Sequence, residues 1–535
     1  MKKLLIIAGI LILYGCQKTD VFDNTEVPSL VLNSTASSNC IAQAEELDYK
    51  IYPMTSDGSR VGDMAVLYDT NEQDFNIYFI KDIWNDPTNE RHPWYAFEST
   101  DFYNYSETGE ILASSTALCD QDFAIGAGSV MKNNDTYYAF YTGHNPNSGN
   151  CSNSEREAIM LATSNNPDQL FTKRNNFTTI TVPKSQGFDE NDNFRDPFVF
   201  EDGGQFHMLI SARKNVNGTW RGVIAHYTSS DLWNWVYSDI LYDGGDEIYW
   251  MMECTEVFKM GGYYYLIYSD QIGKNLYYRK STTLTGSWSK PSDLSRFAGK
   301  GIFAAKSAID QYGDRYLFGW KNNLSGDTDS GNWKWAGNLV SHKIYSLPNG
   351  DLAASIPHTL KNIMETNNYS ITKNSQWGSV TKTDPNAESY NLISNANFDV
   401  ANVIYDPVSA EKYKIDADVS FNSSNKDFGF MIGACDGYED FYSLRFIPSE
   451  NRFSFDKQNR SNLTTTSIAE NYVPITLTPN TIYNIQIIIE NSMVVVYIND
   501  KAALSNRIYK ATNTNWGIFV DNSNVNFENI KLTTP

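Results

Sequence analysis

Three carboxylates occupy similar positions in three well-separated segments of the chain. Asp63 follows Gly62 at the start of an apolar run, Asp196 follows Arg195, and Glu253 lies among methionines and a cysteine. A carboxylate at the start of an apolar strand is costly to bury unless a partner or a substrate uses its charge. A single one is equally compatible with an ordinary turn or strand terminus. Three at matching positions of successive repeats predict a common site on one axis.

The surroundings of the three carboxylates predict different protonation states. Glu253 has apolar neighbours, and desolvation raises the pKa of a carboxyl group, which suits a proton donor. Gly62 leaves an open approach and backbone N–H groups beside Asp63, which favours an ionised nucleophile. Arg195 offers a fork that holds a carboxylate or a sugar hydroxyl beside Asp196. Two carboxyls about 5 Å apart in opposite protonation states are the retaining glycosidase arrangement.

An aromatic strand recurs along the first two thirds of the chain at intervals of roughly 50 to 70 residues. Its copies are Phe75–Phe79, Tyr137–Tyr141, Phe206–Ile210, Tyr264–Tyr268 and Arg315–Gly319. A period in this range, with tight turns between aromatic strands, is typical of a β-propeller with one antiparallel sheet per blade. The five copies predict five blades, with the ligand site over the central channel.

The length of 535 residues predicts two domains, because one compact core does not grow to this size. The propeller pattern extends over residues 41–357. From residue 358 the strands alternate polar and apolar positions, as in 413–419, 428–432 and 483–488. We therefore predict an all-β fold, a five-bladed β-propeller (41–357) followed by a C-terminal β-sandwich (358–535). The second domain shows no cluster of acids, histidines or cysteines, which indicates a packing or sugar-contact role.

The N-terminus has the features of an export signal. Lys2 and Lys3 precede the apolar run 4–13, which is too short to span a bilayer as a helix. The run ends in Leu-Tyr-Gly-Cys16, which resembles a bacterial lipobox. Residues 1–16 are thus predicted to be a lipoprotein signal peptide with Cys16 as the lipidated residue, and 17–40 a flexible tether. We expect an outer-membrane lipoprotein on the periplasmic or the cell-surface face; a plain secretory signal is the alternative.

The formal charge of -21 argues against a nucleic-acid partner and against an acidic polysaccharide, so a neutral substrate is predicted. Besides Cys16 the chain has five cysteines without a CxxC motif, which indicates neither a zinc site nor a complete disulfide framework. A Cys119–Cys151 bridge is compatible with export but is not required. The six histidines show no ligand spacing, so neither a metal nor a cofactor is expected.

The three carboxylates stand in short motifs that resemble a known family. Gly62-Asp63, Arg195-Asp196-Pro197 and Glu253-Cys254, in this order, resemble the three motifs of glycoside hydrolase family 32, the fructan hydrolases and invertases. The resemblance implies that Asp63 is the nucleophile, Glu253 the acid/base and Asp196 a transition-state stabiliser. It implies a retaining glycosidase that cleaves β-fructofuranosyl linkages in levan, inulin or sucrose-type substrates.

The first motif departs from the family pattern, in which asparagine precedes the aspartate and Pro-Asn-Gly follows it; here Gly62 precedes Asp63. The predicted substrate-binding residues are Arg195, Asp82, Trp94, Ser129 and Trp320. The loop after the first blade, with Asp82, Trp84, Asp86, His92 and Trp94, is interpreted either as a pocket wall or as a solvated loop. The same two interpretations apply to Asp122 and His144.

Two other functions are compatible with this sequence. An inverting five-bladed furanosidase of the arabinan-degrading type shares the propeller, but its carboxyls lie further apart. A surface glycan-binding lipoprotein without catalysis is the second, although a pure binder gains nothing from burying both Asp63 and Glu253. Endo or exo action and linkage preference stay open.

Overall fold

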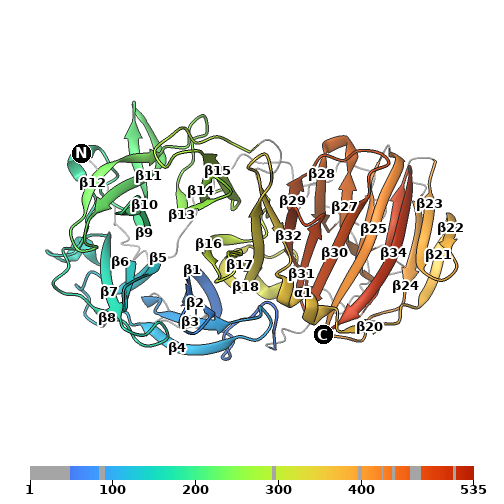
Figure 1. Ribbon diagram of the computed structural model, residues 1–535, viewed down its shortest axis with the longest axis horizontal. Helices are drawn as coiled ribbons and strands as arrows, with labels where there is room; N and C mark the ends of the chain where they lie inside the picture. The colour runs from blue at the N-terminus through green and yellow to red at the C-terminus, as the bar shows by residue number, and fades with distance from the viewer. Residues whose placement is uncertain are drawn as a thin grey trace, which may run out of the picture. The chain divides into compact units, whose positions relative to one another are not determined.

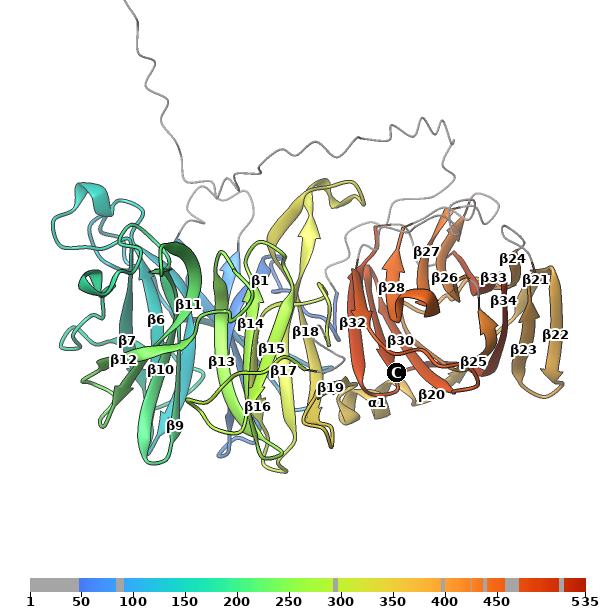
Figure 2. The ribbon, with the colours of Figure 1, turned by 90° about the horizontal axis from the view of Figure 1, so that it is seen from above.

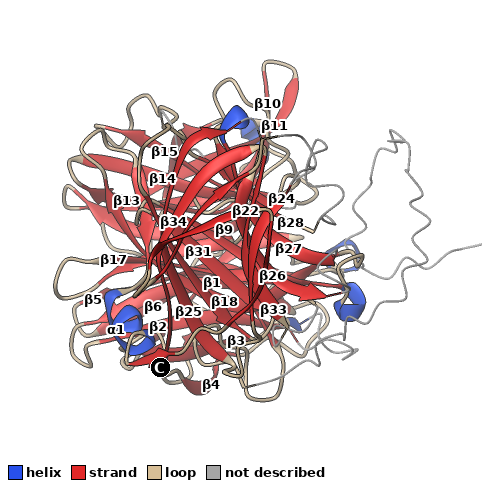
Figure 3. Ribbon diagram, turned by 90° about the vertical axis from the view of Figure 1, so that its right-hand side faces the viewer, coloured by secondary structure: helices blue, strands red, loops and turns tan. Residues whose placement is uncertain are grey.

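The computed structural model describes residues 48–82, 91–291, 297–395, 400–424, 426–435, 440–457, 471–509 and 514–535. Over these ranges the chain is nearly all β-structure, with one α-helix, α1 (His358–Met364), and short 3₁₀ turns (Figure 3). None of the helices described is long and apolar enough to cross a membrane. The predicted signal peptide and tether, Cys16, Trp84 and Asp86 lie outside the described residues, so these predictions stay untested.

The strands before α1 form five consecutive antiparallel groups in the described part of the chain, arranged around a common centre (Figure 1). The first two groups are β1 (Arg60–Asp69), β2 (Asp74–Asp82), β3 (Trp94–Ser99) and β4 (Ser106–Leu112), then β5 (Ala124–Asn133), β6 (Thr136–His144), β7 (Glu157–Ser164) and β8 (Thr172–Lys173). The third is β9 (Phe194–Asp202), β10 (Gln205–Val216), β11 (Thr219–Ser229) and β12 (Val236–Tyr242). The last two are β13 (Met252–Met260), β14 (Tyr263–Asp270) and β15 (Leu276–Ser281), then β16 (Phe303–Ile309), β17 (Arg315–Leu324), β18 (Trp333–Ser346) and β19 (Leu352–Ser355).

The first strands of the five groups form a closed ring. β1, β5, β9, β13 and β16 contact one another in this order, and β16 returns to contact β1. The last group also pairs with the first through Val61 and Gly337. Closure of this kind is the architecture of a β-propeller, and the five groups agree with the predicted number of blades. The recurring aromatic strand of the sequence is the second strand of each group.

The aromatic strands pack neighbouring blades together. The ring centroid of Phe75 in β2 lies 5.3 Å from those of Phe102, Tyr316 and Phe318. Tyr316 and Phe318 belong to β17 of the last blade, so this cluster joins the two ends of the ring. Large aromatic side chains bury much area at edge-on and tilted geometries, which explains their recurrence at this position.

Each first strand carries a register irregularity near its start, as expected for a β-bulge. The shifts lie between Val61 and Met64 in β1, Ile125 and Gly128 in β5, Leu209 and Ser211 opposite β9, Glu253 and Glu256 in β13, and Phe303 and Lys306 in β16. Bulges re-aim side chains and interrupt pairing, so they are suited to a site on the propeller axis. The one in β9 also accommodates Pro197, which has no N–H for the ladder.

The C-terminal strands form two antiparallel sheets that face each other (Figure 2). The first contains β20 (Asn367–Tyr369), β22 (Ser379–Asp384), β23 (Glu388–Ile393), β25 (Lys412–Ser424), β30 (Tyr483–Glu490), β31 (Met493–Ile498), β32 (Ala502–Arg507) and β34 (Ser523–Thr534). The second contains β21 (Lys373–Trp377), β24 (Val400–Tyr405), β26 (Phe428–Cys435), β27 (Asp440–Ile447), β28 (Arg452–Asp456), β29 (Asn471–Pro474) and β33 (Asn515–Asp521). Phe430 and Phe527 meet edge to face between the sheets, with centroids 5.8 Å apart. The predicted fold class, propeller then sandwich, is confirmed.

Candidate active site

The predicted catalytic residues lie at one edge of the blades. In an antiparallel sheet the start of the first strand, the end of the second and the start of the third share an edge. In the first blade this edge holds Asp63 in β1, Asp82 at the end of β2 and Trp94 at the start of β3. The starts of β9 and β13 bring Asp196 and Glu253 to the equivalent edges of their blades.

The Asp63 carboxylate accepts hydrogen bonds from two indole N–H groups of the last blade. Trp320 donates to Oδ1 over 3.0 Å, and Trp335 donates to the same oxygen over 3.3 Å. A β carbon on Gly62 would lie 2.4 Å from the ring of Trp335, so this ring requires glycine beside Asp63. The two donors stabilise the negative charge of the carboxylate and fix its orientation. Trp320 was predicted from the sequence as a substrate-binding residue, which stays a prediction, and Trp335 was not predicted.

Asp196 is almost fully buried, at 2% exposure, and has a left-handed backbone with φ of 59°. Its Oδ2 accepts the backbone N–H of Cys254 over 2.9 Å, and its own N–H donates to Thr142 Oγ1 over 2.9 Å. A non-glycine residue keeps such a backbone only where its surroundings hold it there. Burial and, more weakly, Glu253 raise the pKa of Asp196 against the opposing effect of Arg195.

Arg195 bridges two carboxylates from different blades. Its Nη2 donates to Glu253 Oε1 over 2.7 Å, and its Nη1 donates to Glu157 Oε1 over 3.1 Å. Glu157, at the start of β7, also accepts the backbone N–H of Phe194 over 2.7 Å. Burial opposes the charge of Glu157, but Arg195 and His144 hold the pKa of Glu157 well below its usual range. Arg195 thus orients Glu253, and Glu157 orients Arg195.

The fork of Arg195 was predicted to hold a carboxylate or a sugar hydroxyl, and it holds two carboxylates that come from other blades. The guanidinium binds Glu253 and Glu157, and Asp196 instead accepts an N–H from the strand that carries Glu253. The left-handed turn at Asp196 directs adjacent side chains to different partners. The predicted desolvation of Glu253 is observed, at 7% exposure, but an ion pair accompanies it.

A buried lysine from β16 adds a positive charge near the carboxylates. Lys306 Nζ donates to the carbonyl of Thr255 over 2.6 Å. Burial lowers the pKa of Lys306, while surrounding groups that include Asp196 and Asp63 raise it. Burial raises the pKa of the Cys254 thiol, and Asp196 and Asp63 act in the same direction. Asp63 and Asp196 therefore both act electrostatically on Lys306 and Cys254. This places the motifs of Asp63, Asp196 and Glu253-Cys254 near one another in space.

Trp94 and Ser129, like Arg195 and Trp320, have partners within the protein. The indole N–H of the buried Trp94 donates to the carbonyl of Gly126 over 3.0 Å. Ser129 Oγ accepts the backbone N–H of Val199 over 3.0 Å. These bonds hold β5 against its neighbouring blades. Substrate contact by Trp94 and Ser129 stays a prediction, as does that of Asp82, which is buried at the end of β2.

The loop that was predicted to follow the first blade lies within that blade, between β2 and β3, and its described part begins at residue 91. His92 lies beside Trp335, with ring centroids 5.2 Å apart, so it is near a partner of Asp63, and the interpretation of this loop as a pocket wall stays a prediction. Asp122 instead accepts the hydroxyl of Tyr141 over 2.9 Å and pairs with Lys173 over 2.5 Å. Asp122 therefore serves the structure of the second blade.

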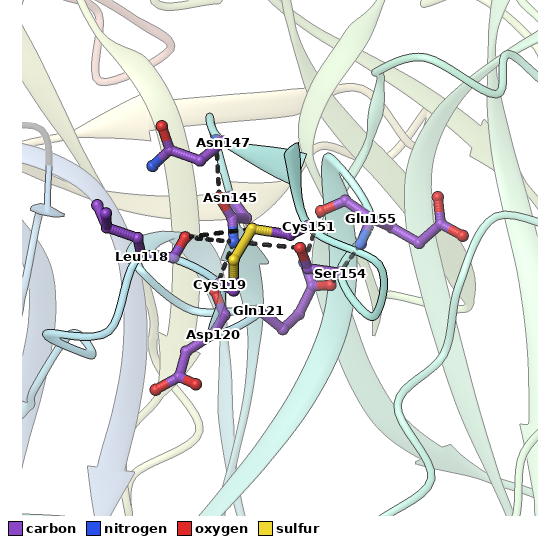
Figure 4. The surroundings of a disulfide bond; sticks show 9 residues. All are labelled: Leu118, Cys119, Asp120, Gln121, Asn145, Asn147, Cys151, Ser154 and Glu155. Carbon is purple, nitrogen blue, oxygen red and sulfur yellow. Dashed lines mark hydrogen bonds between the residues drawn. A yellow bond between two sulfur atoms is a disulfide. The ribbon is translucent and has the colours of Figure 1, made fainter. Parts of the chain in front are cut away.

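Cys119 and Cys151 form a disulfide bond, with α carbons 5.4 Å apart (Figure 4). The bond joins the loop before β5 to the loop after β6, at the edge that carries the site. Asn145 stabilises the same loops through its side-chain amide, which donates to the carbonyls of Leu118 over 3.1 Å and Asp120 over 2.8 Å.

Within the described part of the chain, two groups of side chains bring potential metal ligands within 4.8 Å of one another: His144, Glu157 and Asp192, and Glu72, Asp74 and Glu98. In the first group Glu157 already binds the guanidinium of Arg195, whose positive charge opposes a second cation. The second group comes from β1–β2 and β3 at the edge of the first blade away from the carboxylates. The expected independence from metals and cofactors stays a prediction.

A propeller with three carboxylates around its axis, followed by a sandwich, defines a glycosidase of the propeller class. Residues 70–354 match the model of the glycosyl hydrolases family 32 N-terminal domain, and residues 368–534 match that of the family 32 C terminal. The chain belongs to glycoside hydrolase family 32. The first match begins after Asp63, in agreement with the departure of the first motif from the family pattern.

Several curated bacterial proteins are similar to this chain. A sucrose-6-phosphate hydrolase of Staphylococcus xylosus is 25% identical over 277 residues, which are 48% of this chain and 52% of that protein. A sucrose-6-phosphate hydrolase of Escherichia coli is 25% identical over 72% of this chain and 74% of that protein. A raffinose invertase of Escherichia coli is 28% identical over 46% and 52%. The chain thus spans about half the length of the first and the third.

Solved structures share the fold. Fructan 1-exohydrolase IIa from Cichorium intybus superposes with a TM-score of 0.68 at 15% identity, over 92% of this chain and 98% of that one. Sucrose-6-phosphate hydrolase from Lactobacillus gasseri superposes with a TM-score of 0.64 at 15% identity, over 89% and 92%. Both likenesses extend through the propeller and the sandwich.

Proposed function

We propose that this protein hydrolyses β-fructofuranosyl linkages in neutral fructans or fructooligosaccharides with retention of configuration. The observation that carries the proposal is the common position of Asp63, Asp196 and Glu253 at bulged starts of three first strands of one ring. Their partners differ in kind: two indole N–H groups for Asp63 and a guanidinium for Glu253. The two carboxyls therefore have different surroundings, and a double displacement assigns them different tasks, nucleophile and acid/base.

In the first step Asp63 attacks the anomeric carbon of the fructosyl unit. The bond from this carbon to the leaving oxygen breaks, its electron pair goes to that oxygen, and Glu253 delivers the proton. The indole N–H groups of Trp320 and Trp335 hold the attacking carboxylate in place. Arg195, fixed from behind by Glu157, presents the Glu253 carboxyl to the leaving group.

In the second step Glu253, now ionised, takes a proton from water. The water oxygen attacks the anomeric carbon, the bond to Asp63 breaks, and the carboxylate of Asp63 is restored. The role proposed for Asp196 is to accept hydrogen bonds from ring hydroxyls, which strengthen as positive charge develops on the sugar. Its fixed backbone and its bond from Cys254 keep this carboxyl pre-organised.

The chemistry of the product tests this proposal against the inverting alternative. Proton NMR of the first product released from levan, inulin or sucrose distinguishes β-fructofuranose from its anomer before mutarotation. Retention supports the double displacement, whereas inversion indicates a furanosidase of the arabinan-degrading type. Absence of any released sugar from purified protein indicates a glycan-binding protein.

A second comparison tests the charge of the substrate. Relatives carry the name sucrose-6-phosphate hydrolase, but this chain has a formal charge of -21, which disfavours a phosphorylated sugar in the absence of a dedicated cationic site. We expect kcat/KM for sucrose or fructooligosaccharide to exceed that for sucrose 6-phosphate. The reverse order would reassign the substrate class and leave the glycosidase chemistry intact.

We also propose that the protein is a lipoprotein anchored at Cys16. The lipobox-like residues 13–16 after a short apolar run support this proposal. In a bacterial host, labelled palmitate should enter the wild-type protein and be absent from Cys16→Ser, which should leave the membrane fraction. Equal labelling of both proteins would contradict the proposed anchor.

A further inference from the structure

Two tryptophans near Glu253 in sequence or in the sheet are exposed, whereas Glu253 and Asp196 are buried. Trp220 in β11 is 46% exposed, and Trp250, three residues before Glu253, is 48% exposed. Exposed tryptophan is unusual, because its large ring costs much free energy to leave in water. Two such rings next to the proposed acid/base indicate a surface that a ligand covers.

Arg213 joins the two rings. Its guanidinium carbon lies 3.3 Å from the ring centroid of Trp250 and 5.9 Å from that of Trp220. The side chain of Arg213 is buried and pairs with Asp189 over 3.6 Å, and this ion pair fixes the position of the guanidinium. Among the described residues Nε of Arg213 has no hydrogen-bond partner. The guanidinium therefore acts as a fixed support for two aromatic faces.

The register of the third blade brings the rings to the edge that carries the carboxylates. Ser211 of β10 pairs with Arg195, and β10 continues past the start of β9 to a hairpin in which Asn215 pairs with Trp220. The hairpin thus extends beyond the position of Arg195. Trp220 lies in this hairpin, at the edge of the blade that carries the carboxylates.

The segment that carries Trp250 packs against the same hairpin. Gly222 donates its N–H to the carbonyl of Tyr249 over 2.7 Å. A β carbon on Gly222 would lie 2.8 Å from the α carbon of Met251, so this close approach requires glycine. Trp220 is two residues from Gly222 and shares its face of the sheet, the face toward Trp250.

We propose that Trp220 and Trp250 form a platform that binds a sugar ring of the leaving-group side of the substrate. The three residue steps of extended chain from Trp250 to Glu253 span about 10 Å, roughly one or two sugar units from the scissile bond. The C–H face of a neutral sugar packs on an aromatic ring, and the hydroxyls at its edge stay in water. This inference rests on the proposed function and names the occupant of the surface beside Glu253.

Further apolar side chains extend the platform. Ile248 and Ile272 are each 64% exposed. The turn that carries Ile272 is joined to the Trp250 segment by the N–H of Gln271, which donates to the carbonyl of Met251 over 3.3 Å. The surface therefore continues from the third blade to the fourth, as a chain of several sugar units would need.

Steady-state kinetics with two substrates test the platform. Trp220→Ala and Trp250→Ala should lower kcat/KM for a fructan about tenfold, through KM, and leave an activated aryl fructoside within about twofold, because its leaving group has no sugar ring. Trp250→Phe should keep most of the activity on fructan. Tyr312→Ala is the matched control, because Tyr312 is 79% exposed in the turn between β16 and β17, at the edge away from the carboxylates.

Equal losses on both substrates, or no loss on fructan, would overturn the platform. If wild-type protein cleaves no fructoside, the proposed function fails. The platform can then still be tested by quenching of tryptophan fluorescence on addition of fructan, compared between wild type and Trp250→Ala. Equal quenching in the two proteins overturns the platform. Sedimentation of each variant tests whether a second copy of the chain, and not a sugar, covers the two tryptophans. Self-association lost only in the tryptophan variants would assign the surface to a second copy of the chain and also overturn the platform.

Discussion

The ring of Trp335 occupies the space beside the α carbon of Gly62, where a β carbon would lie 2.4 Å from the ring. The same ring donates its N–H to Asp63 Oδ1 over 3.3 Å. In the family pattern an asparagine precedes the aspartate. In this chain a tryptophan from β18 takes that space and donates a hydrogen bond to the carboxylate. β18 belongs to the last blade, which lies next to the first blade in the closed ring.

The exchange between Gly62 and Trp335 predicts that restoring the family residue is harmful. Gly62→Asn should lower kcat at least about tenfold, because the ring must move and its N–H leaves Asp63. Removing the ring as well, in Gly62→Asn/Trp335→Ala, should recover part of the loss. Gly149→Asn is the control, since no atom lies within 4 Å of a β carbon there. Full activity of Gly62→Asn would show that the indole contact is dispensable.

Asp63→Ala should abolish hydrolysis and leave the fold intact. The expected loss in kcat exceeds about a thousandfold, in line with removal of a covalent nucleophile. The melting temperature should change little, because Asp63 is only partly buried and supplies no core packing. Asp135→Ala, in the exposed turn between β5 and β6, is the control. A variant at residue 63 that keeps a tenth of wild-type turnover would rule out this assignment.

The shared guanidinium of Arg195 predicts a change in the pH profile. In Glu157→Gln the side chain keeps its shape but loses its charge, so Arg195 acts on Glu253 alone and stabilises the ionised carboxyl. The acid form needed for leaving-group protonation is then lost at lower pH. The alkaline limb of kcat/KM should move to lower pH by about half a unit or more.

The side chains in direct contact with Glu253 keep their identity in this variant, and Asp192, whose pKa Glu157 helps to raise, is the neighbour that also responds to the change. Asp196 and Asp270, which interact electrostatically with Glu253, are not substituted, so the shift reports on Glu157. Glu155→Gln, which removes a surface partner of Lys184, is the control and should keep the wild-type profile. A lower rate with an unmoved alkaline limb would mean that Glu157 only supports the fold.

Acid stability should depend on a buried pair of histidines in the third blade. His207 Nδ1 and His226 Nε2 lie 2.9 Å apart, and burial together with His207 lowers the pKa of His226 to about 4. Between pH 6.5 and about 4 the unfolded chain binds this proton more readily than the folded one, so the free energy of unfolding falls as pH falls. Urea unfolding of His226→Gln should show a flatter dependence over this window, by about 1 kcal/mol or more. The exposed His358→Gln should follow wild type, and an unchanged slope in His226→Gln would exclude this pair as the cause.

The sequence predicted those parts of the site that depend on local patterns. The carboxylates of Asp63, Asp196 and Glu253 stand at the starts of apolar strands, and equivalent positions of repeated blades converge by symmetry. Glu157 and Trp335 gave no such signal, because each acquires its role from a contact with a distant part of the chain: Glu157 with Arg195, and Trp335 with Asp63.

The partners of the cysteines and of Trp94 and Ser129 also depend on contacts between distant parts of the chain. Five cysteines besides Cys16 are compatible with many pairings, and only the approach of the loops around β5 and β6 joins Cys119 to Cys151. Trp94 and Ser129 were predicted from their place in the motifs. Their bonds to Gly126 and Val199 depend on how neighbouring blades meet, which no local pattern encodes.

The most direct test of the double displacement combines Glu253→Ala with an activated aryl β-fructoside. The departing phenolate needs little protonation, so the first step should survive, while the fructosyl-enzyme accumulates because no base activates water. We expect a burst of phenolate, slow turnover that azide accelerates, and, in peptide mass spectrometry, a fructosyl ester on Asp63. Sugar and aryl substrates slowed equally, without a burst and without a label on Asp63, would contradict the account.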